Sequence, residues 1–238
     1  YGLLRFGLGL LPDTWQAIAP YLAVWAVVSV IYGCLTAINQ TDMKKMVAYS
    51  SVGHMGYILL ALAAATPLSL LGATFQMVSH GLISALLFIL VGIVYKKTGT
   101  RNLNSLNGLF NPERGLPVTG SLMILAAMAS AGTPGMVGFI AEFVIFRSSF
   151  AVFPVQTLLC MIGTGLTAVY FLIMLDRVFF GRLAVEKAGS QPISTFPFAK
   201  WQEKFPAIAL ALIIVFLGLL PNFATKIMES SVAAIAPI

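Results

Sequence analysis

The sequence contains very few charged residues for its length. Of its 238 residues, 14 are Lys or Arg and 8 are Asp or Glu, so that 9% are charged, whereas a soluble domain contains about 25%. Hydrophobic residues make up 59% of the chain. A soluble fold of this size has too little interior to hide that much apolar surface. The composition therefore excludes a soluble enzyme and predicts a multi-pass protein of the lipid bilayer.

Cysteine and the motifs of soluble enzymes are also scarce or missing. Cys34 and Cys160 lie inside apolar segments without the spacing of metal ligands, so we expect both to pack as small apolar side chains. No phosphate-binding loop, dinucleotide fingerprint or nucleophile elbow is present. The basic residues are not gathered into one patch with interleaved aromatics, which argues against nucleic acid as a partner. We expect no cofactor and no metal in this chain, and any redox chemistry to take place elsewhere.

Long apolar segments are what the sequence does contain. A helix needs about 20 residues to cross the hydrocarbon core. Six segments are long enough, at 17–39, 44–65, 69–95, 117–152, 154–180 and 205–222. The fourth is too long for one straight crossing and is interrupted at Gly132-Thr133-Pro134-Gly135, where proline removes a backbone donor. We predict an all-α membrane fold of about six spans, the fourth broken at this motif, preceded by the end of another helix at residues 1–6.

The basic residues indicate which side of the membrane each loop occupies. Six alternating segments place eleven Lys and Arg residues on one side and three on the other, and the positive-inside rule makes the richer side cytoplasmic or stromal. The longest loop on that side, 183–204, is either a solvated linker or a contact for a neighbouring subunit. Residues 223–238 are predicted as a tail with a short interfacial helix. The richer side carries Lys44, Lys45, Lys96, Lys97, Arg101, Arg114, Arg177, Arg182, Lys187, Lys200 and Lys204, and the other carries Arg5, Arg147 and Lys226.

Three ionisable residues, His54, His80 and Glu142, lie near the middle of apolar segments. An ionisable group at this depth costs roughly 2.5–3.5 kcal/mol on insertion scales and usually faces a protein interior or a path for ions. His54 follows Lys44 by ten positions, about 15 Å along a helix, which is close to the midplane. The three depths roughly coincide. We therefore predict that these residues form one proton relay, although a single buried histidine also serves to bind a neighbouring helix.

Polar neighbours support the prediction of a relay. Tyr49 and Ser50 precede His54, while Gln76 and Ser84 lie four positions before and after His80 and share its helix face. Lys44 and Lys45 mark the cytoplasmic start of the second segment. Pro134 belongs to the predicted break, and breaks of this kind form ion sites in transporters because their free backbone groups need partners.

Three stretches resemble the antiporter-like membrane subunits of respiratory complex I. They are NQTDMKKMVAYSSVGHMG at 39–56, FQMVSHGL at 75–82 and the stretch at 132–143, and the opening YGLLRF fits the same family. The acidic residue at Glu142 is typical of the chain 4 type of cyanobacterial and chloroplast NAD(P)H-quinone oxidoreductases. The segments PERGLP at 112–117 and FPVQTLLC at 153–160 resemble the cyanobacterial forms used in CO2 uptake.

The resemblance implies a specific architecture. Members of the family have fourteen transmembrane helices in two inverted five-helix repeats, and this chain resembles the end of the eighth helix through the fourteenth. His54, His80 and Glu142 match the downstream part of the family's polar axis. The upstream Glu–Lys pair and the central Lys have no counterpart here, because the chain starts after them. A C-terminal fragment of this kind is not expected to translocate protons by itself.

The resemblance also implies partners and a location. They are other membrane-arm subunits, a CO2-hydration subunit, Fe–S clusters and plastoquinone elsewhere in the complex, and a cyanobacterial thylakoid membrane. The favoured function is proton translocation coupled to electron transfer from NAD(P)H or ferredoxin. Two alternatives remain open, a subunit of a multisubunit Na⁺/H⁺ antiporter and a structural membrane subunit whose polar residues only hold helices together.

Overall fold

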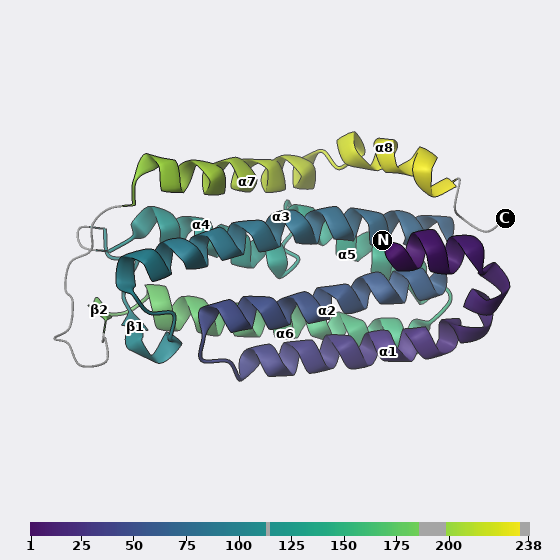
Figure 1. The fold of residues 1–238 in the computed structure, drawn as a ribbon, viewed down its shortest axis with the longest axis horizontal. Helices are drawn as coiled ribbons and strands as arrows, with labels where there is room; N and C mark the ends of the chain where they lie inside the picture. The colour runs from purple at the N-terminus through teal and green to yellow at the C-terminus, as the bar shows by residue number, and fades with distance from the viewer. Residues whose placement is uncertain (113–114, 186–198, 234–238) are drawn as a thin grey trace.

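The protein is a bundle of long helices that run nearly parallel to one another (Figure 1). The computed structural model describes residues 1–112, 115–185 and 199–233. A short π-helix, Leu3–Leu8, precedes the bundle. The α-helices are α1 Pro12–Ile38, α2 Met43–Ala64, α3 Pro67–Thr98, α4 Pro117–Ser130, α5 Val137–Phe150, α6 Pro154–Phe179, α7 Trp201–Leu219 and α8 Asn222–Ala233. Figure 1 shows α7 at one edge of the bundle and α1 at the opposite edge.

The number of membrane crossings agrees with the number predicted from the sequence. Within the described residues, α1, α2, α3, α6 and α7 are long and apolar enough to span a membrane. The helices α4 and α5 are shorter, follow each other across a break at 131–136, and together form the remaining crossing. The predicted all-α membrane fold with one broken helix is therefore confirmed.

Four of the helices begin with a proline. Pro12, Pro67, Pro117 and Pro154 occupy the first turn of α1, α3, α4 and α6, where a helix has no use for the missing N–H. The N-terminus of α2 is capped instead by Asp42, whose Oδ1 accepts hydrogen bonds from the backbone N–H of Lys44 at 2.8 Å and of Lys45 at 3.2 Å. These local signals fix where the spans start.

Three helix ends extend beyond the predicted bounds by three to five residues, and α7 ends at Leu219, three residues before the predicted 222. Helix α1 begins at Pro12 rather than at 17, and α3 continues to Thr98 rather than ending at 95. Helix α7 begins at Trp201 rather than at 205, so that Glu203 and Lys204 lie in its first turn and not in the predicted loop 183–204. Hydropathy misses such ends because polar first and last turns extend beyond the hydrocarbon. The prediction for the rest of that loop, at 186–198, falls outside the described residues.

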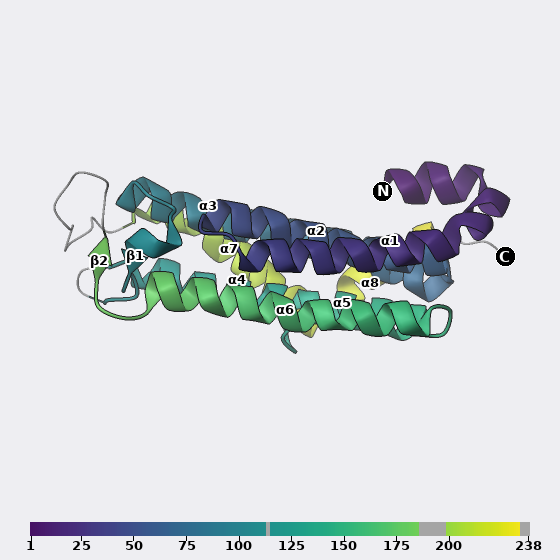
Figure 2. The same cartoon turned by 90° about the horizontal axis from the view of Figure 1, so that it is seen from below.

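One end of the bundle is strongly basic. Nine of the eleven basic residues assigned to the cytoplasmic side lie at the end that carries β1 and β2, while Arg114 and Lys187 lie outside the described residues. There β1 (Leu106–Asn107) follows the 3-10 helix Leu103–Ser105 and pairs antiparallel with β2 (Ala184–Val185), with Leu106 opposite Val185. The described N-terminal segment and α8 lie at the other end (Figures 1 and 2).

The centre of the bundle is tightly packed, and its outer faces are apolar. Helices α1 and α2 approach closely at Gly33, where an added Cβ would lie 2.7 Å from the backbone N of Gly53. Large apolar residues such as Tyr21 and Trp25 of α1 and Leu172 of α6 point outward and are exposed. Such faces suit lipid or a neighbouring membrane subunit. The few polar side chains of the spans are therefore concentrated inside, where the candidate site lies.

Candidate functional site

His54 lies at the centre of the buried polar network. It is near the middle of α2 and is only 4% exposed. Its Nδ1 is 2.8 Å from the carbonyl oxygen of Ser50, one turn earlier in α2. Its Nε2 is 3.2 Å from the carbonyl oxygen of Ser130, the last residue of α4. The imidazole thus links α2, which is continuous, to the C-terminal end of α4, the first half of the broken helix.

Glu142 faces the same ring from the other half of the broken helix. It lies on α5, is 4% exposed, and places Oε1 3.8 Å from Nε2 of His54. Its Oε2 accepts a hydrogen bond of 3.1 Å from the hydroxyl of Thr164 on α6. Three helices therefore fix the carboxyl group, and one oxygen is directed at the histidine.

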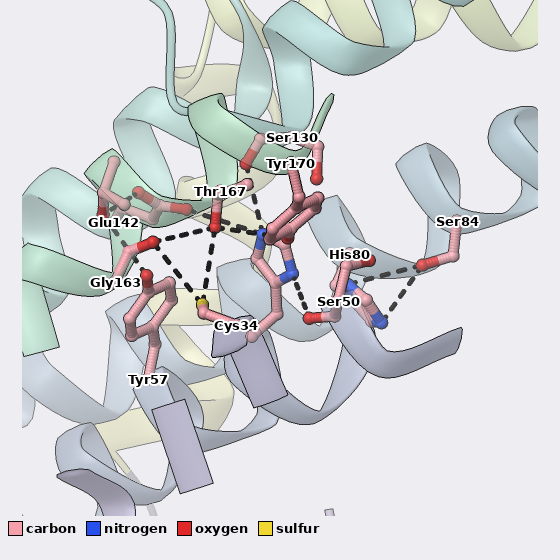
Figure 3. A network of polar contacts seen from close by, with 12 residues as sticks. Cys34, Ser50, Tyr57, His80, Ser84, Ser130, Glu142, Gly163, Thr167 and Tyr170 are labelled. Atoms are coloured by element: carbon pink, nitrogen blue, oxygen red, sulfur yellow. Dashed lines mark hydrogen bonds and ion pairs between the residues drawn. The ribbon is translucent and has the colours of Figure 1, made fainter. Parts of the chain in front are cut away.

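His80 extends the network on the side of α3. Its ring stacks on that of His54, with the centroids 5.1 Å apart and an angle of 29° between the planes. Ser84, one turn further along α3, lies 3.1 Å from Nε2 of His80. Figure 3 shows Glu142 at one end of this network and Ser84 at the other. The structure thus brings together the three titratable residues that the sequence singled out.

The helix break creates the space for this arrangement. Gly132 has φ +69°, and a Cβ there would lie 2.9 Å from Oε2 of Glu142. Gly135 has φ +90°, which L side chains also rarely adopt. With the chain turned in this way, α4 ends at Ser130 with a carbonyl that accepts from a side chain rather than from the next helical turn. The negative end of the α4 dipole then points toward His54.

Both nitrogens of the His54 ring face carbonyl oxygens, which can only accept hydrogen bonds. A neutral imidazole has one N–H and donates to one of the two carbonyls, whereas the imidazolium donates to both. The carboxyl group of Glu142, 3.8 Å away, adds an anion when it is ionised. The site can therefore hold a proton on His54 or, after a small movement, on Glu142.

The predicted supporting residues divide into three groups. Ser50 and Ser84 contact the histidines directly, the first through its backbone oxygen. Gln76 is buried, but no hydrogen bond joins it to His80 among the described residues, and its Oε1 has no partner there. The residues away from the network are Tyr49, which has no described hydrogen bond from its side chain, the exposed Lys44 and Lys45 at the start of α2, and the exposed Pro134 in the break.

Sequence reasoning missed the contribution of α6. Thr164 contacts Glu142, and the hydroxyl of Tyr57 lies 3.4 Å from that of Thr164. One turn further along α6, Thr167 accepts a hydrogen bond of 3.2 Å from Tyr170 and lies 3.9 Å from Sγ of Cys34. The signal in the sequence was a pair of threonines, three positions apart, inside an otherwise apolar span.

The chain matches known proteins along most of its length. Residues 1–167 match the family model described as NADH:quinone oxidoreductase/Mrp antiporter, TM. Among curated relatives, NAD(P)H-quinone oxidoreductase chain 4 1 of Synechococcus elongatus is 38% identical over 99% of this chain and 44% of its own length. NADH-quinone oxidoreductase subunit M of Escherichia coli is 38% identical over 100% of this chain and 45% of its own length.

A solved structure shows the same fold. A chain of the respiratory complex I from Thermus thermophilus with bound NADH superposes with a TM-score of 0.88 at 24% sequence identity. The match covers 99% of this chain and 48% of the Thermus chain. The present chain thus spans about half the length of the proteins that it matches. By its family match, the chain belongs to the NADH:quinone oxidoreductase/Mrp antiporter transmembrane family.

Proposed function

We propose that this chain forms the downstream half of a proton-translocating membrane subunit of an NAD(P)H-quinone oxidoreductase. The observation that carries the proposal is His54, which is buried between Glu142, 3.8 Å away, and the stacked ring of His80. An unperturbed histidine titrates near pH 6.5, so that both of its forms are accessible near neutral pH. Titratable groups that lie together at the centre of a membrane bundle are typical of a path for protons or ions.

The proposed transfer takes place in two steps. His80 passes a proton to the unprotonated nitrogen of the His54 ring through one bridging water, because the N–H bonds lie in the ring planes and not across the stacked faces. His54 then passes the proton from Nε2 to Oε1 of Glu142. These atoms must close from 3.8 Å to about 2.6–3.2 Å, a movement of roughly 1 Å. The break between α4 and α5 allows such a movement because no continuous helix has to bend.

The remainder of the pump is proposed to lie outside this chain. The curated relatives are about twice its length. From the family resemblance, the Glu–Lys pair and the central Lys are proposed to lie upstream of Tyr1. Electron transfer, with its Fe–S clusters and quinone, is proposed to take place in other subunits. The exposed apolar faces of α1 and α6 would then contact lipid or neighbouring membrane-arm subunits.

Three finer proposals rest on the chain 4 motifs alone. They are a thylakoid location, plastoquinone as the electron acceptor, and a CO2-hydration subunit as a neighbour. The identity to the Escherichia coli subunit equals that to the Synechococcus chain, so overall similarity favours neither setting. Separating thylakoid from plasma membranes, isolating the native complex from each in mild detergent, and identifying its quinone and its subunits by mass spectrometry tests all three. Ubiquinone, or the absence of a CO2-hydration subunit, would contradict them.

A second candidate function is that of a Na⁺/H⁺ antiporter subunit, because the matching family includes Mrp antiporters. The two functions differ in what drives proton movement. The complex that contains the full-length chain is reconstituted in vesicles in sodium-free medium, and proton uptake is followed with a pH-sensitive dye during quinone reduction. We expect uptake at the full rate without sodium. Uptake that needs a sodium gradient, and not quinone reduction, would favour the antiporter.

The third reading, a purely structural subunit, makes a different prediction for the same assay. Replacing His54, His80 and Glu142 together by Gln, Gln and Gln removes the three titratable groups of the proposed relay. A structural subunit would still support proton uptake at the wild-type rate once assembled. We expect uptake through this subunit to be lost.

A further inference from the structure

Thr164 is, among the described residues, the only hydrogen-bond donor to Glu142. It lies on α6, which is separate from the broken helix that carries the carboxyl group. Its hydroxyl contacts Oε2 at 3.1 Å, while the other oxygen, Oε1, faces Nε2 of His54 at 3.8 Å. The two carboxyl oxygens therefore have different surroundings.

We propose that Thr164 is a positioning residue, which holds Oε2 of Glu142 so that Oε1 is the oxygen that exchanges a proton with His54. This inference rests on the proposed function. In the exchange, the Nε2–H bond of the imidazolium breaks and an O–H bond forms at Oε1. The ring becomes neutral, and the carboxylate becomes a carboxylic acid. Oε2 becomes the carbonyl oxygen of that acid and continues to accept from Thr164.

The donation from Thr164 to Glu142 determines the role of the other neighbour of Thr164. The Tyr57 hydroxyl lies 3.4 Å from Oγ1 of Thr164. Because the single hydrogen of Thr164 is donated to Glu142, Tyr57 must be the donor in this second contact. Tyr57 is itself held in place by its edge-on contacts with the rings of His54 at 5.8 Å and Phe146 at 5.3 Å. The hydroxyl chain thus ends at the carboxyl group and not elsewhere.

Gly132 leaves room for Oε2 on the side of the break. An added Cβ there would lie 2.9 Å from this oxygen, so Oε2 occupies space that a larger residue would fill. Thr164 then holds Oε2 in this position, whereas Oε1 has the gap toward His54 to close. Loss of the Thr164 hydroxyl would free the carboxyl group to rotate, and the two oxygens would lose their separate roles.

The experiment uses the full-length chain in its assembled complex. T164V removes the hydroxyl and keeps the shape of the side chain, and T164S restores the donor. We expect T164V to slow proton translocation by about tenfold, the effect of losing one hydrogen bond to a charged group, and T164S to recover most of the wild-type rate. The matched control is T157V on the same helix, because the Thr157 hydroxyl donates to the Phe153 carbonyl within its own helix. Its rate should remain close to that of the wild type.

A spectroscopic measurement separates positioning from packing. The C=O stretch of protonated Glu142 is identified in infrared difference spectra as the band that E142Q abolishes. T164V should move this band to higher frequency because the carbonyl loses its donor, and T164S should return it. If T164V does not assemble, T164A replaces it with the same expectations, since Thr164 is only partly buried.

Failure of the positioning role and failure of the proposed function give different results in these experiments. An unshifted band together with wild-type proton translocation in T164V would overturn the positioning role, while loss of translocation in E142Q would leave the proposed function standing. Wild-type translocation in E142Q itself would overturn the proposed function.

Discussion

Glu142 and Glu203 are both carboxylates that join helices, but their surroundings are opposite. Glu203, in the first turn of α7, pairs with Lys96 at 2.6 Å and Lys97 at 3.2 Å at the end of α3. It also accepts from the backbone N–H of Lys200 at 2.8 Å. Glu142 has one hydroxyl donor and one histidine at 3.8 Å. The first carboxylate is fully paired with permanent cations, and the second has a partner that can lose its charge.

This difference separates an anchor from an exchange site. A carboxylate held by two lysines near the water-facing end of a bundle stays ionised and ties α7 to α3. A carboxyl group at the centre of the bundle costs free energy when it is charged, because burial removes most of its solvation. Among the described residues, the one ion-pair partner of Glu142 is His54, and the carboxylate gains stabilisation when that histidine is protonated. The charge of each group thus depends on the other, as a relay requires.

The largest expected effect on proton translocation comes from the loss of His54, and it should exceed the effect of losing His80. H54A removes the ring that lies between His80 and Glu142 and leaves the carbonyl of Ser130, at the end of α4, without its side-chain donor. We expect proton translocation to fall by about 100-fold or more and the protein to lose about 1–3 kcal/mol of stability. H80A removes a stacked ring and the contact with Ser84, so its effects on both should be smaller. Proton uptake in vesicles and thermal unfolding in detergent measure the two quantities, and equal losses in both variants would contradict the central position of His54.

A smaller effect is expected from a methyl group in the helix break. G132A places a Cβ 2.9 Å from Oε2 of Glu142 and also forces an L residue to φ +69°, which costs about 1–2 kcal/mol. G135A is the matched control, because Gly135 has φ +90° but nothing within 4 Å of an added Cβ. Both variants should be destabilised by similar amounts in thermal unfolding. Only G132A should also slow proton translocation, and a similar slowing in G135A would show that backbone strain, not the carboxyl contact, is responsible.

The smallest effect is expected at the anchor. E203Q leaves an uncharged side chain between Lys96 and Lys97, so the tie between α3 and α7 weakens. We expect a small decrease in the Tm of the complex, and a difference from the wild type that shrinks at high salt because salt already screens the original pair. A decrease that does not change with salt concentration would contradict an electrostatic anchor.

The spans and the break could be predicted from the sequence because their signals are local. Hydropathy locates α1, α2, α3, α6 and α7, and Gly132, Pro134 and Gly135 mark the break in the remaining crossing. The common depth of His54, His80 and Glu142 followed from counting residues along helices. Their contact did not follow from depth alone, because it depends on how α2, α3 and α5 are rotated against one another.

The residues that hold Glu142 could not be found in this way. Thr164 lies on another helix, and its contact with Glu142 depends on how α5 and α6 pack. Gln76 was expected beside His80 from helical spacing, yet no hydrogen bond joins them among the described residues. The pairing of β1 with β2 was missed for the same reason. Two-residue strands are fixed by tertiary contacts and have no periodic pattern of their own.

The role of Glu142 as the exchange site is tested most directly when the two carboxylates are compared in one assay. E142Q and E203Q remove one negative charge each from the full-length chain in its complex, and the number of protons translocated per electron pair is measured in vesicles while quinone is reduced. We expect E142Q to lower this ratio with the complex still assembled, and E203Q to leave the ratio at the wild-type value. An unchanged ratio in E142Q, or an equal loss in both variants, would contradict the role of Glu142 as the exchange site.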